Sequence, residues 1–351
     1  MNFKIGILGG TGLEDLKIFT NAQELRVNTP FGLPSDALIE GKVGDNTCIL
    51  LARHGRKHEI SPTNVNYRAN LWAVMQQGAK VILFTAACGS LKELTPCSFV
   101  FLDSVIDRTY KREVTFHDGK DGHPKGVCHI PMYPAYNEKL RQVLITSAEE
   151  LKYKFFKTGT AICTEGPPFP SRAEIELYRS WNADIANMTV CPEVYLAKEL
   201  GIPFATTAIV TDYDCWREDE KVSVDFVAQR MRESSDRVKT LFVTAIKKIG
   251  AMDWGNEIME AKVYLAKELG IPFATTAIVT DYDCWREGEK VSVDFVAQRM
   301  RESSDRVKTL FVTAIKKIGA MDWGNEIMEA KKTARAGVMI DEHVVFDHLK
   351  Y

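Results

Sequence analysis

Residues 3–12 read FKIGILGGTG, an apolar run that goes directly into a cluster of glycines. A short run without a polar face predicts a buried strand of a mostly parallel sheet. The glycines let the backbone turn its N–H groups toward an anion, and Thr11 adds a hydroxyl donor. A plain tight turn is the alternative. The dinucleotide pattern GxGxxG fails because Asp15 occupies its third glycine position, and a P-loop fails because no lysine follows.

Similar apolar runs recur along the chain and alternate with helical patterns. Strands are expected at residues 36–40, 47–51, 81–84, 99–102, 158–163 and 203–210, and helices at 64–77, 137–150, 171–180, from Pro192 and at 222–249. Ser171 and Glu174 have the spacing of a capping box, and residues 107–136 have the composition of a long surface loop. This alternation predicts an α/β fold with a mixed, mostly parallel central sheet flanked by helices. Ligands then bind at the carboxyl ends of the strands.

Residues 194–262 are repeated as residues 263–331, and the two copies differ only where Asp219 is replaced by Gly288. Exposed positions drift in evolved repeats, so a copy this close indicates a recent event or an artefact added to a finished domain. We expect one catalytic domain at 1–262, a duplicate at 263–331 and a tail at 332–351. Each copy carries a strand, a pair of aspartates and a long helix, and only one can fill the sheet.

The first copy follows directly from residues 187–189, whereas use of the second copy excludes a 69-residue loop. Closing such a loop costs roughly 4 kcal/mol. We therefore expect Asp212 and Asp214 to complete the site, with Asp281 and Asp283 as the alternatives. The surplus copy predicts aggregation, swapping between subunits or lower stability.

Composition excludes several classes of function. The chain is 45% hydrophobic and 26% charged, with a net charge of −2, which gives no field for nucleic acid or an anionic membrane. No apolar run approaches the ~20 residues of a spanning helix. The eight cysteines form no CxxC pair, which is typical of reduced thiols in a cytoplasmic protein. We therefore expect the protein in the cytoplasm, with the nucleus as a second location. His54 and His58 lack an acidic or cysteine partner nearby, so we expect no metal.

Two predicted strand ends carry groups that suit an anion. Residues 53–58 read RHGRKH, and an arginine fork beside histidine donors suits a phosphate, although a solvated basic loop is the alternative. Residues 85–90 are all small and permit close backbone approach to a ligand, or close helix–strand packing.

Two further strand ends suit a sugar and a base. In residues 187–189, Thr189 would donate to an anion and Met188 would pack on a ribose, unless Met188 only fills the core. Asp212 and Asp214 lie two residues apart after an apolar strand, so burial and mutual repulsion raise their pKa values. A carboxylic acid kept protonated near neutral pH donates to a heterocycle nitrogen. A helix-capping turn with exposed acids is the alternative.

Together these motifs resemble the methylthioadenosine phosphorylase family of the trimeric purine nucleoside phosphorylases. The strings that carry the resemblance lie at residues 4–13, 29–32, 34–37, 52–56, 88–90, 129–132, 165–167, 171–174, 187–189 and 211–216. The resemblance implies a nucleoside phosphorylase-like fold, a homotrimer and, in methionine and purine salvage, phosphorolysis of methylthioadenosine to adenine and methylthioribose-1-phosphate. It implies inorganic phosphate as co-substrate, with no metal or organic cofactor.

The resemblance also assigns roles to individual residues. Phosphate would be bound by Thr11, Arg53, His54, Thr189 and the backbone near Ala86 and Ala87. Asp212 and Asp214 would face the purine, one protonating N7 and the other accepting from the 6-amino group. The nucleoside would further contact Phe169, Pro170, Asn187, Met188, Thr211, Val224 and Val227, with His129 reaching in from a neighbouring subunit.

This chain departs from the family pattern at two places. Ala86 stands where relatives usually carry threonine, so a hydroxyl donor is missing or is supplied by Thr85. Pro168 and Pro170 stiffen the segment that borders the base and the 5′ pocket, which extends the expected substrates to adenosine or other 6-aminopurine nucleosides. The competing hypotheses are a phosphorylase of 6-oxopurine nucleosides such as inosine, against which the two aspartates argue, and a catalytically impaired nucleoside-binding protein.

Overall fold

The computed structural model describes residues 3–10, 18–217, 223–254, 293–320 and 322. The chain divides into two compact units, residues 1–262 and 263–351, so that the second unit starts at the first residue of the second copy. The described part of the second unit contains the helix α7 (Val293–Ala320). The predicted tail at 332–351 lies outside the described residues, as do Thr11, Asp281 and Asp283.

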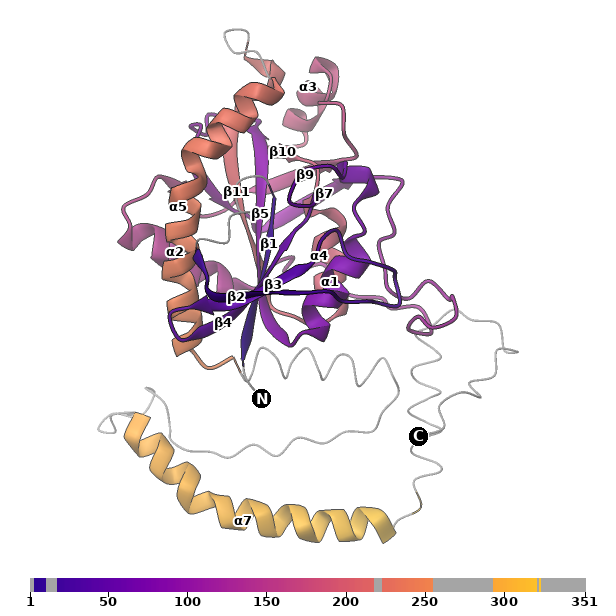
Figure 1. Cartoon of the computed structure of the whole chain (residues 1–351), viewed down its shortest axis with the longest axis vertical. Coiled ribbons are helices and arrows are strands. Elements are labelled where there is room, and N and C mark those ends of the chain that lie inside the picture. The colour runs from indigo at the N-terminus through magenta and orange to yellow at the C-terminus, as the bar shows by residue number, and fades with distance from the viewer. Residues whose placement is uncertain (1–2, 11–17, 218–222, 255–292, 321, 323–351) are drawn as a thin grey trace. The chain divides into compact units, whose positions relative to one another are not determined.

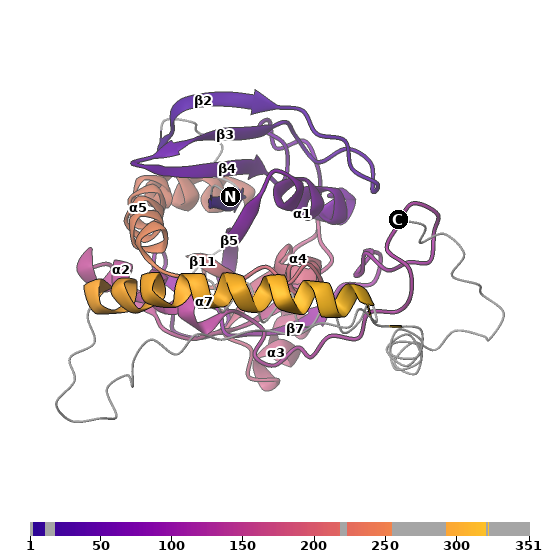
Figure 2. The same ribbon diagram turned by 90° about the horizontal axis from the view of Figure 1, so that it is seen from below.

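The described part of the first unit forms an 11-stranded sheet around the central strand β5. Its strands are β1 (Lys4–Gly9), β2 (Thr20–Leu25), β3 (Leu38–Val43), β4 (Asn46–Ala52), β5 (Ala79–Ser90), β6 (Phe99–Phe101), β7 (Ser104–Arg108), β8 (Phe155–Phe156), β9 (Thr160–Thr164), β10 (Ile185–Asn187) and β11 (Phe204–Asp212). The main path runs β2-β3-β4-β1-β5-β10-β9-β7, while β11 pairs with β5 and β6, and β6 pairs with β8. Figure 2 shows β2, β3 and β4 beside one another along one side of this sheet.

Most pairings in the sheet are parallel. The parallel pairs are β1–β4, β1–β5, β5–β11, β6–β8, β7–β9 and β9–β10, and the antiparallel pairs are β2–β3, β3–β4, β5–β10 and β6–β11. The structure confirms the expected mixed, mostly parallel sheet. The first copy supplies both β11 and the helix α5 (Val224–Ala251).

Helices cover both faces of the sheet (Figure 1). On one face, α2 (Glu138–Glu150) and α5 pack against β11, and Leu144 and Leu241 are fully buried in that core. On the other face, α1 (Tyr67–Gln76) and α4 (Val190–Glu199) pack together, and Leu71 and Val194 lie in a second core. The strands are therefore buried on both sides, which explains why their sequences lack an alternating polar face.

The helix α3 (Arg172–Ser180) begins with the predicted capping box, which the structure confirms: Glu174 N donates to Ser171 Oγ, and Ser171 N donates to Glu174 Oε2 at 2.8 Å. The 3-10 helix η3 (Asp214–Trp216) packs against α3 at the carboxyl end of β11, and η2 (Pro62–Asn64) precedes α1. Among the described helices, none combines the length with the apolar composition that a membrane-spanning segment requires.

Candidate active site

The strand β5 lies in the middle of the sheet, but part of one of its edges has no strand partner among the described residues. We call this part the open edge. On one side it pairs with β1 as far as Phe84 and with β10 only from Gly89, so residues 85–88 lie between the two partners. Backbone groups alternate along a strand, and Ile82 N donates toward β11. Ala86 therefore directs its amide toward β11, whereas Ala87 directs its amide to the open edge, where it suits an anion. Of the two predicted alanines, only Ala87 has this geometry.

Arg53 and His54 follow β4 and are buried beside this edge. The Arg53 side chain is 1% exposed, and its Nη1 donates to Thr85 O at 3.1 Å. A Cβ placed on Gly10 would lie 3.1 Å from Arg53 Nη1, so the glycine permits this approach. Thr85 Oγ1 accepts from Gly10 N at 3.2 Å, which places the hydroxyl that the chain retains near Ala86 beside the glycine turn.

Only part of the basic RHGRKH segment points inward. Arg56 is exposed and pairs with Asp36 at 3.0 Å and with Glu24, while Lys57 and His58 are also exposed. Residues 56–58 are therefore solvated, as the alternative interpretation expects, whereas Arg53 and His54 are buried and remain candidates for phosphate binding.

His54 is neutral at physiological pH. Burial, together with the nearby Arg53 charge, lowers the pKa of His54 to about 4. Its Nδ1 lies 2.8 Å from Ile60 O, so Nδ1–H donates to this carbonyl and Nε2 keeps its lone pair. A neutral histidine in this tautomer accepts from a protonated phosphate oxygen.

The segment after β10 is held against the open edge by Asn187. The Asn187 side chain donates from Nδ2 to Ala87 O at 3.1 Å and accepts from Thr189 N and Val190 N, both at 2.8 Å. All of these bonds go to backbone groups, so Asn187 orders the loop. Thr189 is the N-cap residue of α4 but makes no side-chain capping bond. Cys191, two residues later, has non-helical angles (φ −105°, ψ 134°), so the regular helix begins after it and the Thr189 hydroxyl lies in the turn that precedes the helix.

Asp212 and Asp214 converge on one spot at the end of β11. A Cβ placed on Gly89 would lie 2.7 Å from Asp214 Oδ2 and 3.0 Å from Asp212 Oδ1. The two carboxylates thus lie against a backbone that has no side chain, as the run of small residues predicts. Asp214 has φ 55°, a left-handed conformation that is costly for a side-chain-bearing residue and that clusters at functional sites.

Hydrogen bonds distinguish the two carboxylates. Asp212 accepts from Thr211 Oγ1 at 2.6 Å and from Asp214 N at 2.8 Å, one bond to each oxygen. Thr211 Oγ1 also lies 3.1 Å from Cys88 O, so its role is to hold Asp212 against β5. Asp214 accepts from Cys215 N at 2.8 Å through Oδ1.

Both carboxyl groups are 3–4% exposed, and burial raises their pKa values. The pKa of Asp214 reaches about 6, with repulsion by Asp212 adding to burial and the Cys215 backbone bond opposing it. The pair therefore takes up one proton near neutral pH and can donate it to a base.

The other predicted substrate residues differ in their contacts and in their exposure. Gly166 allows the Met188 sulfur to approach its backbone, since a Cβ there would lie 2.6 Å from Sδ. Pro170 O accepts from Cys215 Sγ at 3.9 Å, which places Pro170 beside the aspartate turn, and Phe169 is 44% exposed. Val227 packs on the α5 core, whereas Val224, at the start of α5, is 72% exposed.

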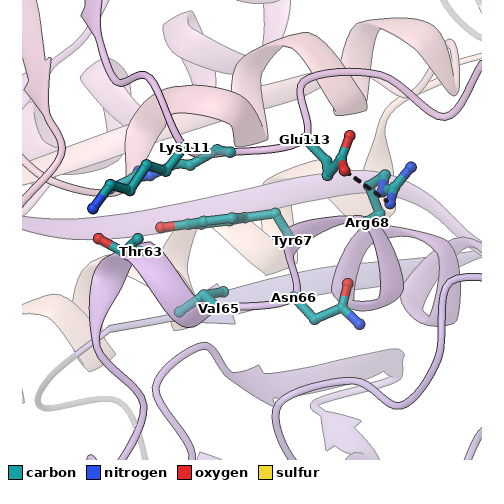
Figure 3. A pocket seen from close by; sticks show the side chains of 8 residues that line it. Thr63, Val65, Asn66, Tyr67, Arg68, Lys111 and Glu113 are labelled. Carbon is teal, nitrogen blue, oxygen red and sulfur yellow. Dashed lines mark ion pairs between the residues drawn. The ribbon is translucent and has the colours of Figure 1, made fainter. Parts of the chain in front are cut away.

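His129 lies on the wall of a cavity. It lines a cavity of about 410 Å³ together with Asp107, Val114, Thr115, Cys128, Ile130, Met132, Tyr195 and Glu199. A second cavity, of about 120 Å³, lies between Tyr67 and Lys111, where Arg68 and Glu113 form an ion pair at 4.0 Å (Figure 3). Neither aspartate lines either cavity.

Sequence reasoning missed a buried cluster of charges behind the site. Arg112 donates through Nη1 to Met188 O at 2.7 Å and through Nε to Glu165 Oε1 at 3.0 Å. Glu193 accepts from Nε and Nη2 of Arg53, the latter at 2.9 Å. Arg112 lies in the segment interpreted as a surface loop. The sequence contains one indication of the role of Glu193: it is an acidic residue among apolar ones at 190–194.

Over the described residues, no group of three or more His, Cys, Asp or Glu side chains could hold a metal ion.

Comparisons with known proteins show which family this chain resembles. Residues 4–247 match the family described as the phosphorylase superfamily. The chain is 49% identical over 280 residues to S-methyl-5′-thioadenosine phosphorylase of Caenorhabditis elegans, covering 78% of this chain and 97% of that protein. It is 48% identical to the protein of the same name from Danio rerio, covering 77% and 97% of the two chains.

Solved structures give the same result. Methylthioadenosine phosphorylase from Schistosoma mansoni in complex with adenine aligns with a TM-score of 0.73 at 42% identity, covering 75% of this chain and 97% of that chain. A mutant of the adenosine/methylthioadenosine phosphorylase from that organism, in complex with methylthioadenosine, aligns with a TM-score of 0.73 at 41% identity, again covering 75% and 97%. The chain therefore belongs to the S-methyl-5′-thioadenosine phosphorylase family within the phosphorylase superfamily.

Proposed function

We propose that this chain catalyses the phosphorolysis of 5′-methylthioadenosine, giving adenine and 5-methylthioribose-1-phosphate. The observation that carries the proposal is the convergence of Asp212 and Asp214 on Gly89, on the same strand whose open edge begins at Thr85, where Arg53 binds. A proton donor for a purine and donors for an anion thus meet at one end of the sheet. Membership of the family supports this substrate.

The reaction needs an anion below the sugar and an acid beside the base. A phosphate oxygen forms a bond to C1′ while the C1′–N9 bond breaks, and the bonding electrons leave with the purine. The proton held by Asp212 and Asp214 moves to N7, so the base departs as neutral adenine. The proton released when phosphate becomes an ester restores the pair through solvent. Arg53, the Ala87 amide and the Thr189 hydroxyl orient and stabilise phosphate, and no covalent enzyme intermediate is required. Inorganic phosphate is thus a co-substrate, and no organic cofactor or metal takes part.

Adenosine is a second candidate substrate. The related protein from Schistosoma mansoni carries adenosine in its name together with methylthioadenosine. Inosine is disfavoured because a carboxylate beside position 6 accepts from an amino group and repels a carbonyl oxygen.

We further propose that the active form is a homotrimer in which His129 completes the 5′ pocket of a neighbouring copy. The position of His129 in a cavity that lacks both aspartates supports a role outside its own site. Sedimentation should give three times the mass of the chain, and a monomer with full activity would contradict the proposal.

The test uses the second copy as an internal control. Asp212→Asn should lower phosphate-dependent adenine release by about 10²–10⁴-fold, the usual contribution of a general acid or base. Asp281→Asn makes the same change in the second copy and should leave the rate unchanged, because β11 comes from the first copy. Loss of activity in Asp281→Asn with retention in Asp212→Asn would overturn this assignment.

A further inference from the structure

The Arg53 guanidinium is held by protein atoms on three of its five N–H groups. Nε and Nη2 donate to the two carboxylate oxygens of Glu193, and Nη1 donates to Thr85 O at 3.1 Å. The Arg53 and Glu193 side chains are only 1% and 2% exposed. These three contacts fix the plane of the rigid guanidinium group. One N–H group on Nη1 and one on Nη2 remain for another acceptor.

Glu193 also links separate parts of the site. It lies in the first turn of α4, four residues after Thr189, while Arg53 follows β4 and Thr85 lies on the open edge of β5. The Arg53–Glu193 pair therefore ties the end of β4 to the helix that follows the Asn187–Thr189 loop. Burial raises the pKa of Glu193 and the Arg53 charge opposes this effect. A carboxylate that accepts on both oxygens is in its ionised form.

We propose that Glu193 is a positioning residue for phosphate, acting through Arg53. Its carboxylate sets the plane of the guanidinium and thereby the position of Nη1 beside Gly10, where the remaining N–H groups of Nη1 and Nη2 are left for an anion. The carboxylate also shares the charge of Arg53, so the arginine acts by directed hydrogen bonds more than as an isolated cation. This inference rests on the proposed phosphorolysis. The competing interpretation is a buried ion pair that serves stability alone.

The test compares the KM for phosphate with the KM for methylthioadenosine in the full chain. Glu193→Gln keeps the shape, removes the charge and places an amide N–H against the arginine. It should raise the KM for phosphate by at least roughly tenfold and change the KM for the nucleoside by less than about twofold. Calorimetric titration with inorganic phosphate should show the same loss of affinity without turnover.

Two further variants separate positioning from stability. Asp118→Asn is the matched control, because Asp118 likewise accepts from an arginine, Arg68 Nη1 at 2.7 Å, and the two side chains are only 9% and 12% exposed. It should leave both KM values unchanged. In an Arg53→Lys background, Glu193→Gln should have no further effect on the KM for phosphate, because the fork that it positions is gone. Multiplicative effects in the double variant would overturn the proposal.

If Glu193→Gln does not fold, Glu193→Asp decides. The shorter side chain keeps the charge but draws Arg53 away from Gly10, and it should raise the KM for phosphate selectively. A wild-type KM for phosphate in a folded Glu193→Gln or Glu193→Asp protein would overturn the inference. Failure of the wild-type chain to bind phosphate or to need it for turnover would instead overturn the proposed function.

Discussion

Asp214 combines a left-handed backbone, burial and a neighbouring carboxylate, each of which costs stability. Its pKa rises from 3.8 to about 6, so the folded state binds a proton between these pH values that the unfolded state has lost. Stability therefore falls as pH rises through this window, and the cost is complete above pH 6. A residue that is destabilising at neutral pH and lies at a strand end is expected to serve the reaction.

Asp214→Asn should therefore stabilise the fold while it removes activity. Asparagine tolerates the left-handed conformation, keeps the bond from Cys215 N and removes the charge, so unfolding at pH 7.5 should require about 2 kcal/mol more free energy. The gain should shrink toward pH 4, where Asp214 is protonated. Urea unfolding at both pH values checks this, and equal or lower stability of the variant at pH 7.5 would argue against the assigned pKa.

Gly89 shows how the packing of two strands sets the site. β5 and β11 run parallel, and the carboxylates at the end of β11 lie against the position where β5 has no side chain. Gly89→Ala should displace Asp212 and Asp214, lowering kcat/KM for the nucleoside at least roughly tenfold and stability by about 1–3 kcal/mol.

The control for Gly89→Ala is Gly159→Ala. A Cβ on Gly159 would lie 2.4 Å from Val100 Cγ1, a similar collision in a part of the sheet without site residues. It should lower the melting temperature but leave kcat/KM intact. Equal kinetic losses in both variants would mean that the effect comes from general destabilisation.

Elements with strong apolar patterns were predictable from the sequence, whereas those fixed by tertiary contacts were not. The apolar runs predicted β1, β4, β9 and β11, and the capping box predicted the start of α3. The strand β2 has the polar sequence TNAQEL and forms by pairing with β3, and β10 has only three residues. The same limit applies to the site. The aspartates and Arg53 follow recognisable strands, whereas Arg112 reaches Met188 from a distant segment that has no pattern of its own.

At the scale of the whole molecule, one sequence occurs in two environments. On α5, Leu241, Phe242 and Ile246 are fully buried, whereas their copies on α7, Leu310, Phe311 and Ile315, are 48–64% exposed. Burial of such a side chain contributes about 1.5–3 kcal/mol, so the exposed copies favour self-association.

Deletion of residues 263–331 should therefore reduce aggregation without loss of catalysis. The deletion joins Lys262 to Lys332 and restores the sequence context that Lys331 has before the tail. Light scattering during heating should show a later onset, and phosphate-dependent turnover should be equal or higher. Equal melting temperature, scattering and assembly with and without the segment would contradict this prediction.

The central claim is that phosphate, and not water, takes the sugar from the base. The direct measurement is phosphorus NMR of the full chain incubated with methylthioadenosine and inorganic phosphate, with adenine measured in parallel. We predict one sugar-1-phosphate ester for each adenine released, and no adenine without phosphate. Adenine that appears with free methylthioribose and no phosphate ester would contradict the account.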